Sequence, residues 1–228
     1  MHIDIMKGEL AKGTKFHTPY YIVEGPTIGA TVMVTAGVHG NETASVKAAK
    51  QFVHSLQQGL LHVQKGTLVI VPLVNQQAYT KRIRGVPDLN RTFPSRAHDK
   101  PRHPLSADLF RLAAQYRPAW YIDMHEANGL SRLNPKVLGQ SLLIDRRSPS
   151  VKIVRQIVKR INRSIERQAT HFTVRLRELP GSGRTAAARL LQAKAITVET
   201  SWSLSHPIRV KYQKNILRQL LKRAGLIQ

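Results

Sequence analysis

A histidine and a glutamate three residues apart follow an apolar segment early in the chain. His39 and Glu42 come after residues 31–36, and Gly37 and Gly40 beside them carry no side chain that would hinder a sharp turn. Imidazole nitrogen and carboxylate oxygen are two of the three protein ligand types of a catalytic zinc ion, whose fourth position is open to water. The spacing indicates half of a metal site. A loop histidine followed by a glutamate in the first turn of a helix has the same pattern.

Two further polar positions end apolar segments of the sequence. His125 follows the apolar residues 119–124, so two parallel strands could bring it to the sheet edge that holds the first histidine. Asp123, two residues earlier, could face the sheet or support a ligand. Glu126 fits a polar loop residue better than a fourth ligand. Glu199 ends the last apolar run and is another carboxylate at a strand end.

A polar stretch from 75 to 104 shows no regular period. Irregular segments of this length inside a compact domain are usually functional or disordered. At its centre lies the run Asp88-Leu89-Asn90-Arg91, which in isolation could be a turn with local side-chain hydrogen bonds. Beside two histidines at strand ends, we interpret it as part of a site.

Hydrophobic periodicity predicts alternating strands and helices around these residues. We expect strands at 19–23, 30–36, 67–74, 119–124, 141–144, 172–176 and 195–198. We expect helices at 44–56, 106–116, 151–167, 184–192 and 208–226. The order strand, helix, strand is typical of a parallel sheet, so the chain should be of the α/β class.

Size and composition limit the class of protein. The 228 residues, 42% of them apolar, are enough for one buried core, and we expect a single domain over residues 1–228. The sequence contains neither an apolar run of membrane-spanning length nor a signal-peptide core at its start, so we expect a cytoplasmic protein without a membrane partner. Cysteine is absent, which excludes disulfides and thiolate metal sites.

The charge is strongly positive and uneven. There are 36 Lys and Arg residues against 13 Asp and Glu, and the net charge is +23. Residues 145–228 hold 19 of the basic but only four of the acidic residues. Such a surface attracts anions through a field that salt screens. The charge alone does not name a ligand, and a solvated basic face would give the same composition.

The order of these motifs resembles the zinc carboxypeptidase superfamily, and more narrowly its succinylglutamate desuccinylase and aspartoacylase branch. The matching pieces span residues 18 to 224. They are His39-x-x-Glu42, Asn75-x-x-Ala78-Tyr79, Arg84, Asp88-Leu89-Asn90-Arg91, Asp123-Met124-His125 and Thr197-Val198-Glu199. The resemblance implies a three-layer α/β/α fold with a mostly parallel mixed sheet.

The resemblance also implies a role for each polar residue at the centre. His39, Glu42 and His125 would bind one zinc ion per chain, with water in the open position. Glu199 would be the general base that takes a proton from this water and passes it to the leaving amine. Asp88 would orient a zinc-bound histidine.

Substrate contacts follow from the same resemblance. Arg84 would polarise the scissile carbonyl, while Asn90 and Arg91 would hold a substrate carboxylate. The spacing from Arg84 to Asp88 is shorter than usual in the family, so Arg82 could take the role of Arg84.

Two other family features are not placed by the sequence. No motif identifies a substrate-capping tyrosine, and Tyr79, Tyr121 and Tyr212 are the candidates. The chain ends at Gln228 without the C-terminal domain that narrows the entrance in aspartoacylases, so we expect a more open site.

These features predict a zinc-dependent hydrolase of an amide bond beside a carboxylate. Its partner would be a small acidic substrate, either an N-acyl amino acid or a peptide C-terminus. The alternative within enzymes is a metallocarboxypeptidase acting on peptides or cell-wall peptides. A different class would be an inactive hydrolase scaffold that binds polyanions. We do not expect nucleic acid as a partner, because no aromatic residues interleave with the basic ones.

Overall fold

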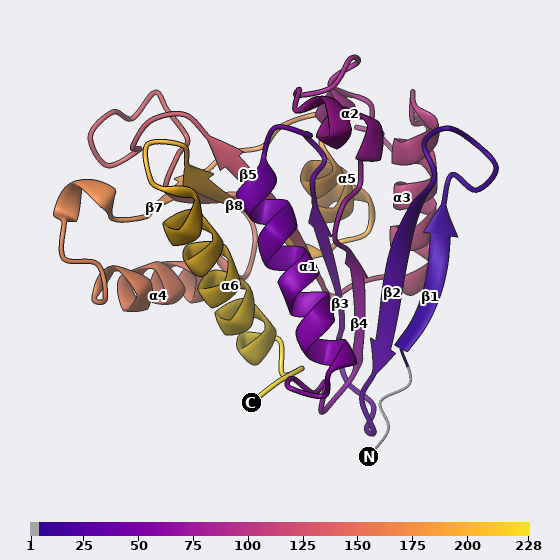
Figure 1. Cartoon of the computed structure of the whole chain (residues 1–228), viewed down its shortest axis with the longest axis horizontal. Helices are drawn as coiled ribbons and strands as arrows, with labels where there is room; N and C mark the ends of the chain where they lie inside the picture. The colour runs from indigo at the N-terminus through magenta and orange to yellow at the C-terminus, as the bar shows by residue number, and fades with distance from the viewer. Residues whose placement is uncertain (1–4) are drawn as a thin grey trace.

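The computed structural model describes residues 5–228 as an eight-stranded sheet with helices on both faces (Figure 1). The strands are β1 Ile5–Leu10, β2 Thr18–Glu24, β3 Thr31–Ala36, β4 Thr67–Val71, β5 Trp120–Ala127, β6 Ser141–Ile144, β7 Thr173–Leu176 and β8 Lys194–Ser201. The helices are α1 Thr43–Gln57, α2 Gln76–Lys81, α3 Pro104–Tyr116, α4 Val151–Asn162, α5 Gly183–Leu190 and α6 His206–Arg223, with short 3-10 helices at Leu89–Arg91 and Gln168–Thr170.

The sheet is mixed, and its strand order is β1-β2-β4-β3-β5-β8-β6-β7. Its central strands β4, β3, β5 and β8 are parallel, as the strand–helix–strand order predicts. Antiparallel pairs join β1 to β2, β2 to β4 and β6 to β8. With helices on both faces, this arrangement confirms the predicted three-layer α/β/α fold.

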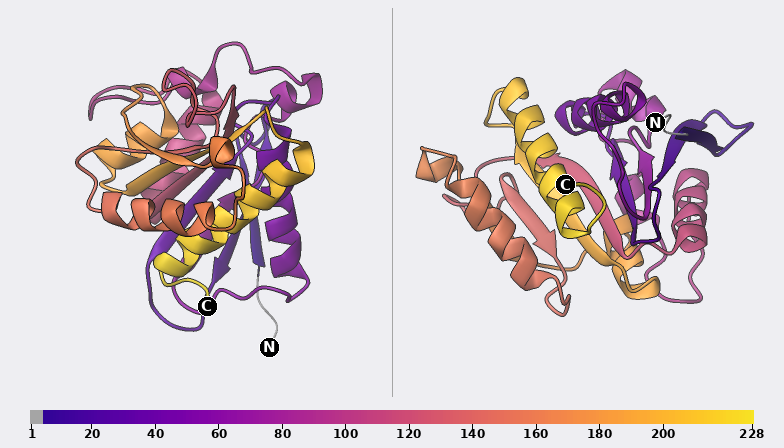
Figure 2. Two further views of the ribbon diagram at one scale, coloured as in Figure 1. Left: turned by 90° about the vertical axis from the view of Figure 1, so that its left-hand side faces the viewer. Right: turned by 90° about the horizontal axis from the view of Figure 1, so that it is seen from below.

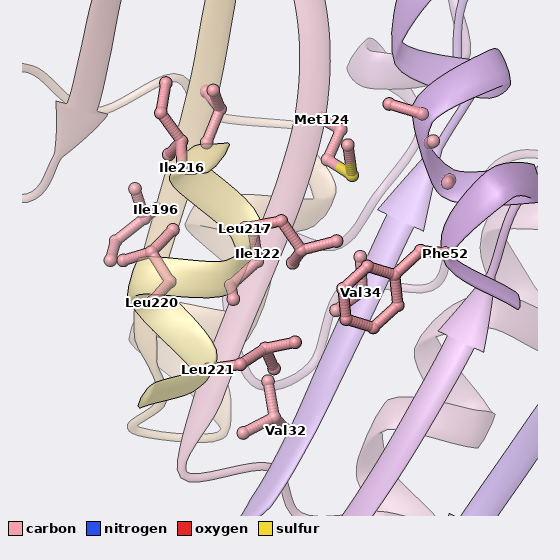
Figure 3. Packing of buried hydrophobic residues seen from close by; sticks show 14 of the residues in the cluster. Val32, Val34, Phe52, Ile122, Met124, Ile196, Ile216, Leu217, Leu220 and Leu221 are labelled. Carbon is pink, nitrogen blue, oxygen red and sulfur yellow. The ribbon is translucent and has the colours of Figure 1, made fainter. Parts of the chain in front are cut away.

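Helices α1, α4 and α6 cover one face of the sheet, because every second strand residue points toward them. Figure 3 shows Val34 and Ile122 of the sheet packed with Phe52 of α1 and Leu217 of α6. These four side chains are at most 2% exposed. Burial of each contributes roughly 1.5–3 kcal/mol relative to an exposed position. The apolar stripes of the three helices are therefore what fixes this layer.

The intervening strand residues face a second, smaller core. Met33, Val69 and Tyr121 of the sheet pack there with Leu109 of α3 and Ala186 of α5. The view from below in Figure 2 shows the helices divided between the two sides of the sheet. The alternation explains why the central strands are apolar at nearly every position.

The parallel strands β3, β5 and β8 end side by side, and this edge positions the polar residues. In register, Ala36 of β3 pairs with Met124 of β5, and His125 pairs with Glu199 of β8. Helix α2 and the start of α1 lie at the same edge, at the top of Figure 1. The carboxyl ends of parallel strands are where α/β proteins place their sites.

Strand β1, helix α2 and the two 3-10 helices were not predicted. Strand β1 has a mixed exposure pattern and contains Gly8, so its pairing with β2 rather than its local sequence determines it. Helix α2 lies inside the stretch that we expected to be irregular. It begins because the Asn75 side chain accepts a hydrogen bond from Ala78 N at 3.1 Å, which caps the helix.

Helix α4 ends at Asn162, five residues before the predicted end. The Asn162 side chain accepts a hydrogen bond from Phe172 N at 2.8 Å and donates one to Phe172 O at 2.9 Å. These two bonds fix the chain that leads into β7. Ile165 remains buried beyond the helix, which explains why the apolar period continued past its end.

No helix within residues 5–228 combines the length and the apolar character needed to cross a membrane.

Candidate metal centre

Three buried side chains converge at the end of β3 and within β5. Nδ1 of His39 lies 2.6 Å from Oε1 of Glu42, and Nδ1 of His125 lies 2.8 Å from Oε2 of the same carboxylate. The three side chains are 1–3% exposed. One ligand atom from each lies within 4.8 Å of the others. The two segments singled out by residue type and spacing thus meet at one point.

Local backbone geometry sends the first two of these residues inward. Gly37 has a φ of 68°, a region open to glycine, and the chain turns there after β3. Glu42 occupies the N-cap of α1, yet its side chain makes no capping hydrogen bond. Its carboxylate contacts the two histidines instead. The alternative of a simple helix-start glutamate therefore does not describe this residue.

Gly40 lies in this turn in close contact with the backbone of α2. A Cβ atom at Gly40 would come within 1.9 Å of the carbonyl carbon of Ala78 and 2.2 Å of Tyr79 N. We expect Gly40→Ala to lower the free energy of unfolding by about 2 kcal/mol or more, because backbone on both sides must move. Urea unfolding of chelator-treated protein measures the change.

Gly13→Ala is the matched control for this substitution. Gly13, unlike Gly40, has a positive φ, of 75°, and nothing lies within 4 Å of its Cβ position. It should cost only the left-handed backbone penalty of roughly 1–2 kcal/mol. Equal destabilisation by the two variants would show that the contact with α2 is unimportant.

An aspartate lies beside the second nitrogen of each histidine. Nε2 of His39 lies 3.0 Å from Oδ1 of Asp88, and Nε2 of His125 lies 2.9 Å from Oδ2 of Asp123. Thr35 donates a hydrogen bond to Asp123 at 2.7 Å. Such partners orient the ring and would leave Nδ1 free to bind a metal. Asp123 thus lies against His125, where it would support this residue as a ligand.

The charges in this cluster stabilise one another. Burial acts to lower the pKa of His39 and His125, but the neighbouring carboxylates outweigh it and the pKa of both is raised. Burial acts to raise the pKa of Glu42, but the two histidines lower it to about 2. The Glu42 carboxylate is therefore ionised at neutral pH, as a metal ligand must be.

The arrangement fits a bound cation. Two imidazole nitrogens and both carboxylate oxygens face one small volume, and Glu42 Oε2 has no well-aligned hydrogen-bond donor among the described residues. A hydrogen-bonded cluster would satisfy this buried oxygen. Two nitrogens and one carboxylate, without thiolates, match the ligand set of a catalytic zinc site.

Glu199 lies beside the cluster, on the strand next to His125. Burial, with the nearby charges of Glu42 and Asp123, raises its pKa to about 8 although the histidines oppose this. Its Oε2 has no hydrogen-bond partner among the described residues. Strands β5 and β8 continue to Ala127 and Ser201, so His125 and Glu199 lie within strands and not beyond their ends.

A cavity of about 360 Å³ opens over these groups. Asn90, Arg91 and Arg84 line it with the three cluster residues and Glu199. Arg84 donates from Nε to Asp88 Oδ2 at 3.1 Å, and Arg91 donates from Nη1 to Asn90 O at 2.8 Å. Both arginine side chains are 48% exposed, so their remaining donors can reach a ligand.

Several other candidates lie outside this cavity. Arg82 stacks on the ring of Tyr79 at 4.1 Å, so of the two arginines only Arg84 lines the cavity. Tyr121 is buried near Thr35, and Tyr212 packs against Phe172. No tyrosine lines the cavity within the described part of the chain, so the structure places none of the three candidates for a capping tyrosine there.

Glu126 was wrongly interpreted as a loop residue. It lies in β5, where it is 2% exposed, accepts a hydrogen bond from Ala44 N at 2.8 Å and forms an ion pair with Arg209. These contacts satisfy its carboxylate, and Glu126 also lines the metal cavity. The contacts join β5 to the starts of α1 and α6.

Three basic residues of the cavity were missed. Lys136, Arg177 and Arg184 also line it. Arg184 is 1% exposed, and its Nη1 has no hydrogen-bond partner among the described residues. In the sequence it is only the arginine after a Gly-Ser-Gly turn. Its position in the first turn of α5, below the capping Ser182, is what buries it.

Sequence comparisons connect the chain with known proteins. Residues 28–202 match the model of the succinylglutamate desuccinylase/aspartoacylase catalytic domain. A succinylglutamate desuccinylase of Burkholderia cenocepacia is 35% identical over 108 residues, which is 43% of this chain and 31% of that protein. The match therefore spans about a third of the length of this relative.

Solved structures share the fold. The product-bound cell shape determinant Csd4 of Helicobacter pylori superposes with a TM-score of 0.75 at 19% identity, over 99% of this chain and 56% of Csd4. Another structure of Csd4 is described as the mDAP-bound form of a D,L-carboxypeptidase. The product-bound ectoine utilization protein EutE (DoeB) of Ruegeria pomeroyi superposes with a TM-score of 0.70 at 19% identity, over 98% of this chain and 68% of that one.

Proposed function

Because the chain belongs to the succinylglutamate desuccinylase/aspartoacylase catalytic-domain family, we propose that it is a zinc-dependent hydrolase of an amide bond beside a carboxylate. The observation that carries this proposal is the convergence of His39, Glu42 and His125 beside Glu199 at the floor of one cavity. The residue types match those that the reaction needs. Amide hydrolysis is proposed from the family, and an acidic substrate is proposed from the basic residues that line the cavity.

His39, Glu42 and His125 would hold one zinc ion per chain. When bound, zinc would act as a Lewis acid and lower the pKa of a coordinated water toward neutrality. Glu199 would take a proton from the attacking water and later return it to the leaving amine. A carboxyl whose pKa lies near neutrality is suited to both transfers. Asp88 and Asp123 would keep the two imidazoles in the required orientation.

The basic residues of the cavity support an acidic substrate. Arg84 would stabilise the negative charge that develops on the scissile carbonyl, and Asn90 with Arg91 would hold a carboxylate. Further basic groups line the same cavity, namely Lys136, Arg177 and Arg184. Several basic residues in one cavity favour a ligand with more than one anionic group, either an N-acyl amino acid or a peptide C-terminus.

A carboxypeptidase activity on peptides or cell-wall peptides is the second candidate. The observation that favours it is the superposition with Csd4 over nearly the whole chain. Csd4 is described as a D,L-carboxypeptidase in its mDAP-bound form, and another of its structures contains a tripeptide. Both activities would use the same central residues, so only a comparison of substrates can distinguish them.

Metal analysis of the purified protein, followed by a substrate screen, tests the proposal. We expect about one zinc per chain and release of an amino acid from N-succinyl or N-acetyl acidic amino acids. Faster release of the terminal residue from short peptides would instead favour the carboxypeptidase. A zinc-loaded protein that hydrolyses neither class would contradict a hydrolase function.

Replacement of Arg91 by lysine separates recognition from general charge. Lysine keeps the positive charge but cannot form the two-pronged contact of a guanidinium with a carboxylate. We expect Arg91→Lys to lower kcat/KM roughly tenfold for a carboxylate substrate and to change it little for the methyl ester. The measurement is kcat/KM for both substrates over a range of ionic strength.

Arg155→Lys provides the matched control, because Arg155 is exposed on α4 and does not line the cavity. It should leave both values unchanged. Charge removal at Arg155, Lys159 and Arg163 should change mainly the salt dependence of substrate association. If Arg91→Lys still distinguishes carboxylate from ester as well as wild type does, the carboxylate is bound elsewhere.

A further inference from the structure

A second concave site lies between α1, α2 and the start of α6. Its volume is about 670 Å³, and it shares no lining residue with the metal cavity. Its basic lining residues are Lys47, Lys50, His54, Arg82 and His206, and Tyr79 forms part of its wall. We call the cavity that these residues line the second pocket. Two of them, Tyr79 and Arg82, belong to motifs that the metal centre leaves without a role.

An aromatic ring orders the cations of the second pocket. The guanidinium carbon of Arg82 lies 4.1 Å from the ring centroid of Tyr79, and Nζ of Lys50 lies 5.3 Å from the same centroid. Cation–π contacts of this kind contribute about 0.5–1 kcal/mol at exposed positions. Arg82 also ends α2 with a φ of 54°, and its backbone N–H bonds to Tyr79 O at 3.2 Å. The orientation of the Arg82 side chain is therefore determined both by its backbone conformation and by its contact with the Tyr79 ring.

No carboxylate lines the second pocket within residues 5–228. The two long helices beside it, α1 and α6, contain no Asp or Glu residue at all. Burial, followed by the charges of Arg209 and Lys47, lowers the pKa of His206, so the cations that define this pocket are Lys47, Lys50 and Arg82. Surface helices normally offset such repulsion with residues of opposite sign. Here a bound anion would provide the missing negative charge.

We propose that the second pocket binds a ligand with adjacent phosphate groups, such as a pyrophosphate or tripolyphosphate moiety. Lysine ammonium groups bind phosphate as point charges, and three or more cations around one cavity match several negative charges on a short ligand. The volume is in the range of small-molecule sites. Tyr79 already carries two cations on its ring, so the pocket recognises phosphates rather than a stacked base.

Calorimetric titration of the zinc-loaded protein with tripolyphosphate at fixed ionic strength tests the proposal. We expect saturable binding to wild type and at least a tenfold weaker affinity in Lys50→Gln/Arg82→Gln. The matched control is Arg160→Gln/Arg218→Gln, which removes the same charge from the basic groove between α4 and α6. This control should stay within twofold of wild type. Zinc content is measured after each titration, because tripolyphosphate chelates metals. Both double variants keep every residue of the metal centre, so their zinc content should match that of wild type.

One further variant and two alternative ligands test which chemical groups the second pocket recognises. Tyr79→Leu keeps every charge but removes the platform, and we expect it to weaken binding several-fold. Citrate should bind more weakly than tripolyphosphate, and a short DNA duplex shows whether polymeric phosphodiesters are bound as well as a free polyphosphate. Equal losses in the two double variants would overturn the proposal, since general surface charge would then explain the binding. Citrate binding as tight as that of tripolyphosphate would also overturn it.

Discussion

His39→Ala should abolish metal binding and hydrolysis together. His39 supplies one of the two imidazole nitrogens that face Glu42, and its removal leaves a buried carboxylate with a single histidine partner. A site with two protein ligands holds zinc far more weakly than one with three. We expect the metal content of the purified variant to fall from about one ion per chain to near zero. Turnover should fall to the background rate.

Metal content and folding have to be measured on the same preparation. Circular dichroism of the chelator-treated wild type gives the reference for a folded protein without metal. The control variant is His62→Ala, whose side chain is exposed in the loop before β4. It should keep the metal and the activity of wild type. If His39→Ala binds zinc with unchanged stoichiometry and affinity, the proposed ligand set is wrong.

The meeting of the site residues was predictable in part, because the hydrophobic pattern shows where the buried strands of a parallel sheet end. The segments before His39, before His125 and around Glu199 are apolar runs separated by helical periods, which favours parallel strands but does not give their order in the sheet, β4-β3-β5-β8. Their carboxyl ends must then share an edge. The two-residue period of a strand also places Asp123 on the same face as His125. That period could have settled its orientation before the structure was known.

The roles of Arg82 and Arg84 could not be separated in the same way. They are two residues apart in a polar stretch without a period, so nothing in the sequence shows which one turns toward the cavity. The structure separates them because α2 ends at Lys81 and Arg82 adopts a left-handed conformation. Its side chain then stacks on Tyr79, while Arg84 reaches Asp88. A helix of six residues is too short to be found by periodicity.

Arg184 and β1 escaped prediction for a related reason. An arginine near the start of an alanine-rich helix is usually solvated, and only the tertiary position of α5 buries Arg184 beside the cavity. Strand β1 is ordered by its pairing with β2, and its own sequence has no clear alternation. Long-range contacts decide both cases. Local patterns do not report such contacts.

Glu199→Gln should lower turnover by roughly two to four orders of magnitude while zinc stays bound. Glu199 lines the cavity on the strand next to His125, and its free oxygen has no hydrogen-bond partner among the described residues. Glutamine keeps the shape of the side chain but cannot accept a proton. The change removes proton transfer and leaves substrate contacts in place, so kcat should fall and KM should change little. Steady-state kinetics and metal analysis measure the two effects.

Glu166→Gln is the control for this substitution, because Glu166 is exposed and does not line the cavity. The same chemical change there should leave kcat, KM and metal content as in wild type. Folding of Glu199→Gln should also be preserved, since burial already favours the neutral form of this carboxyl and its pKa is about 8. A neutral amide in its position therefore adds no unpaired buried charge. Retention of more than a tenth of wild-type turnover would exclude Glu199 as the general base and direct attention to another carboxylate of the cavity.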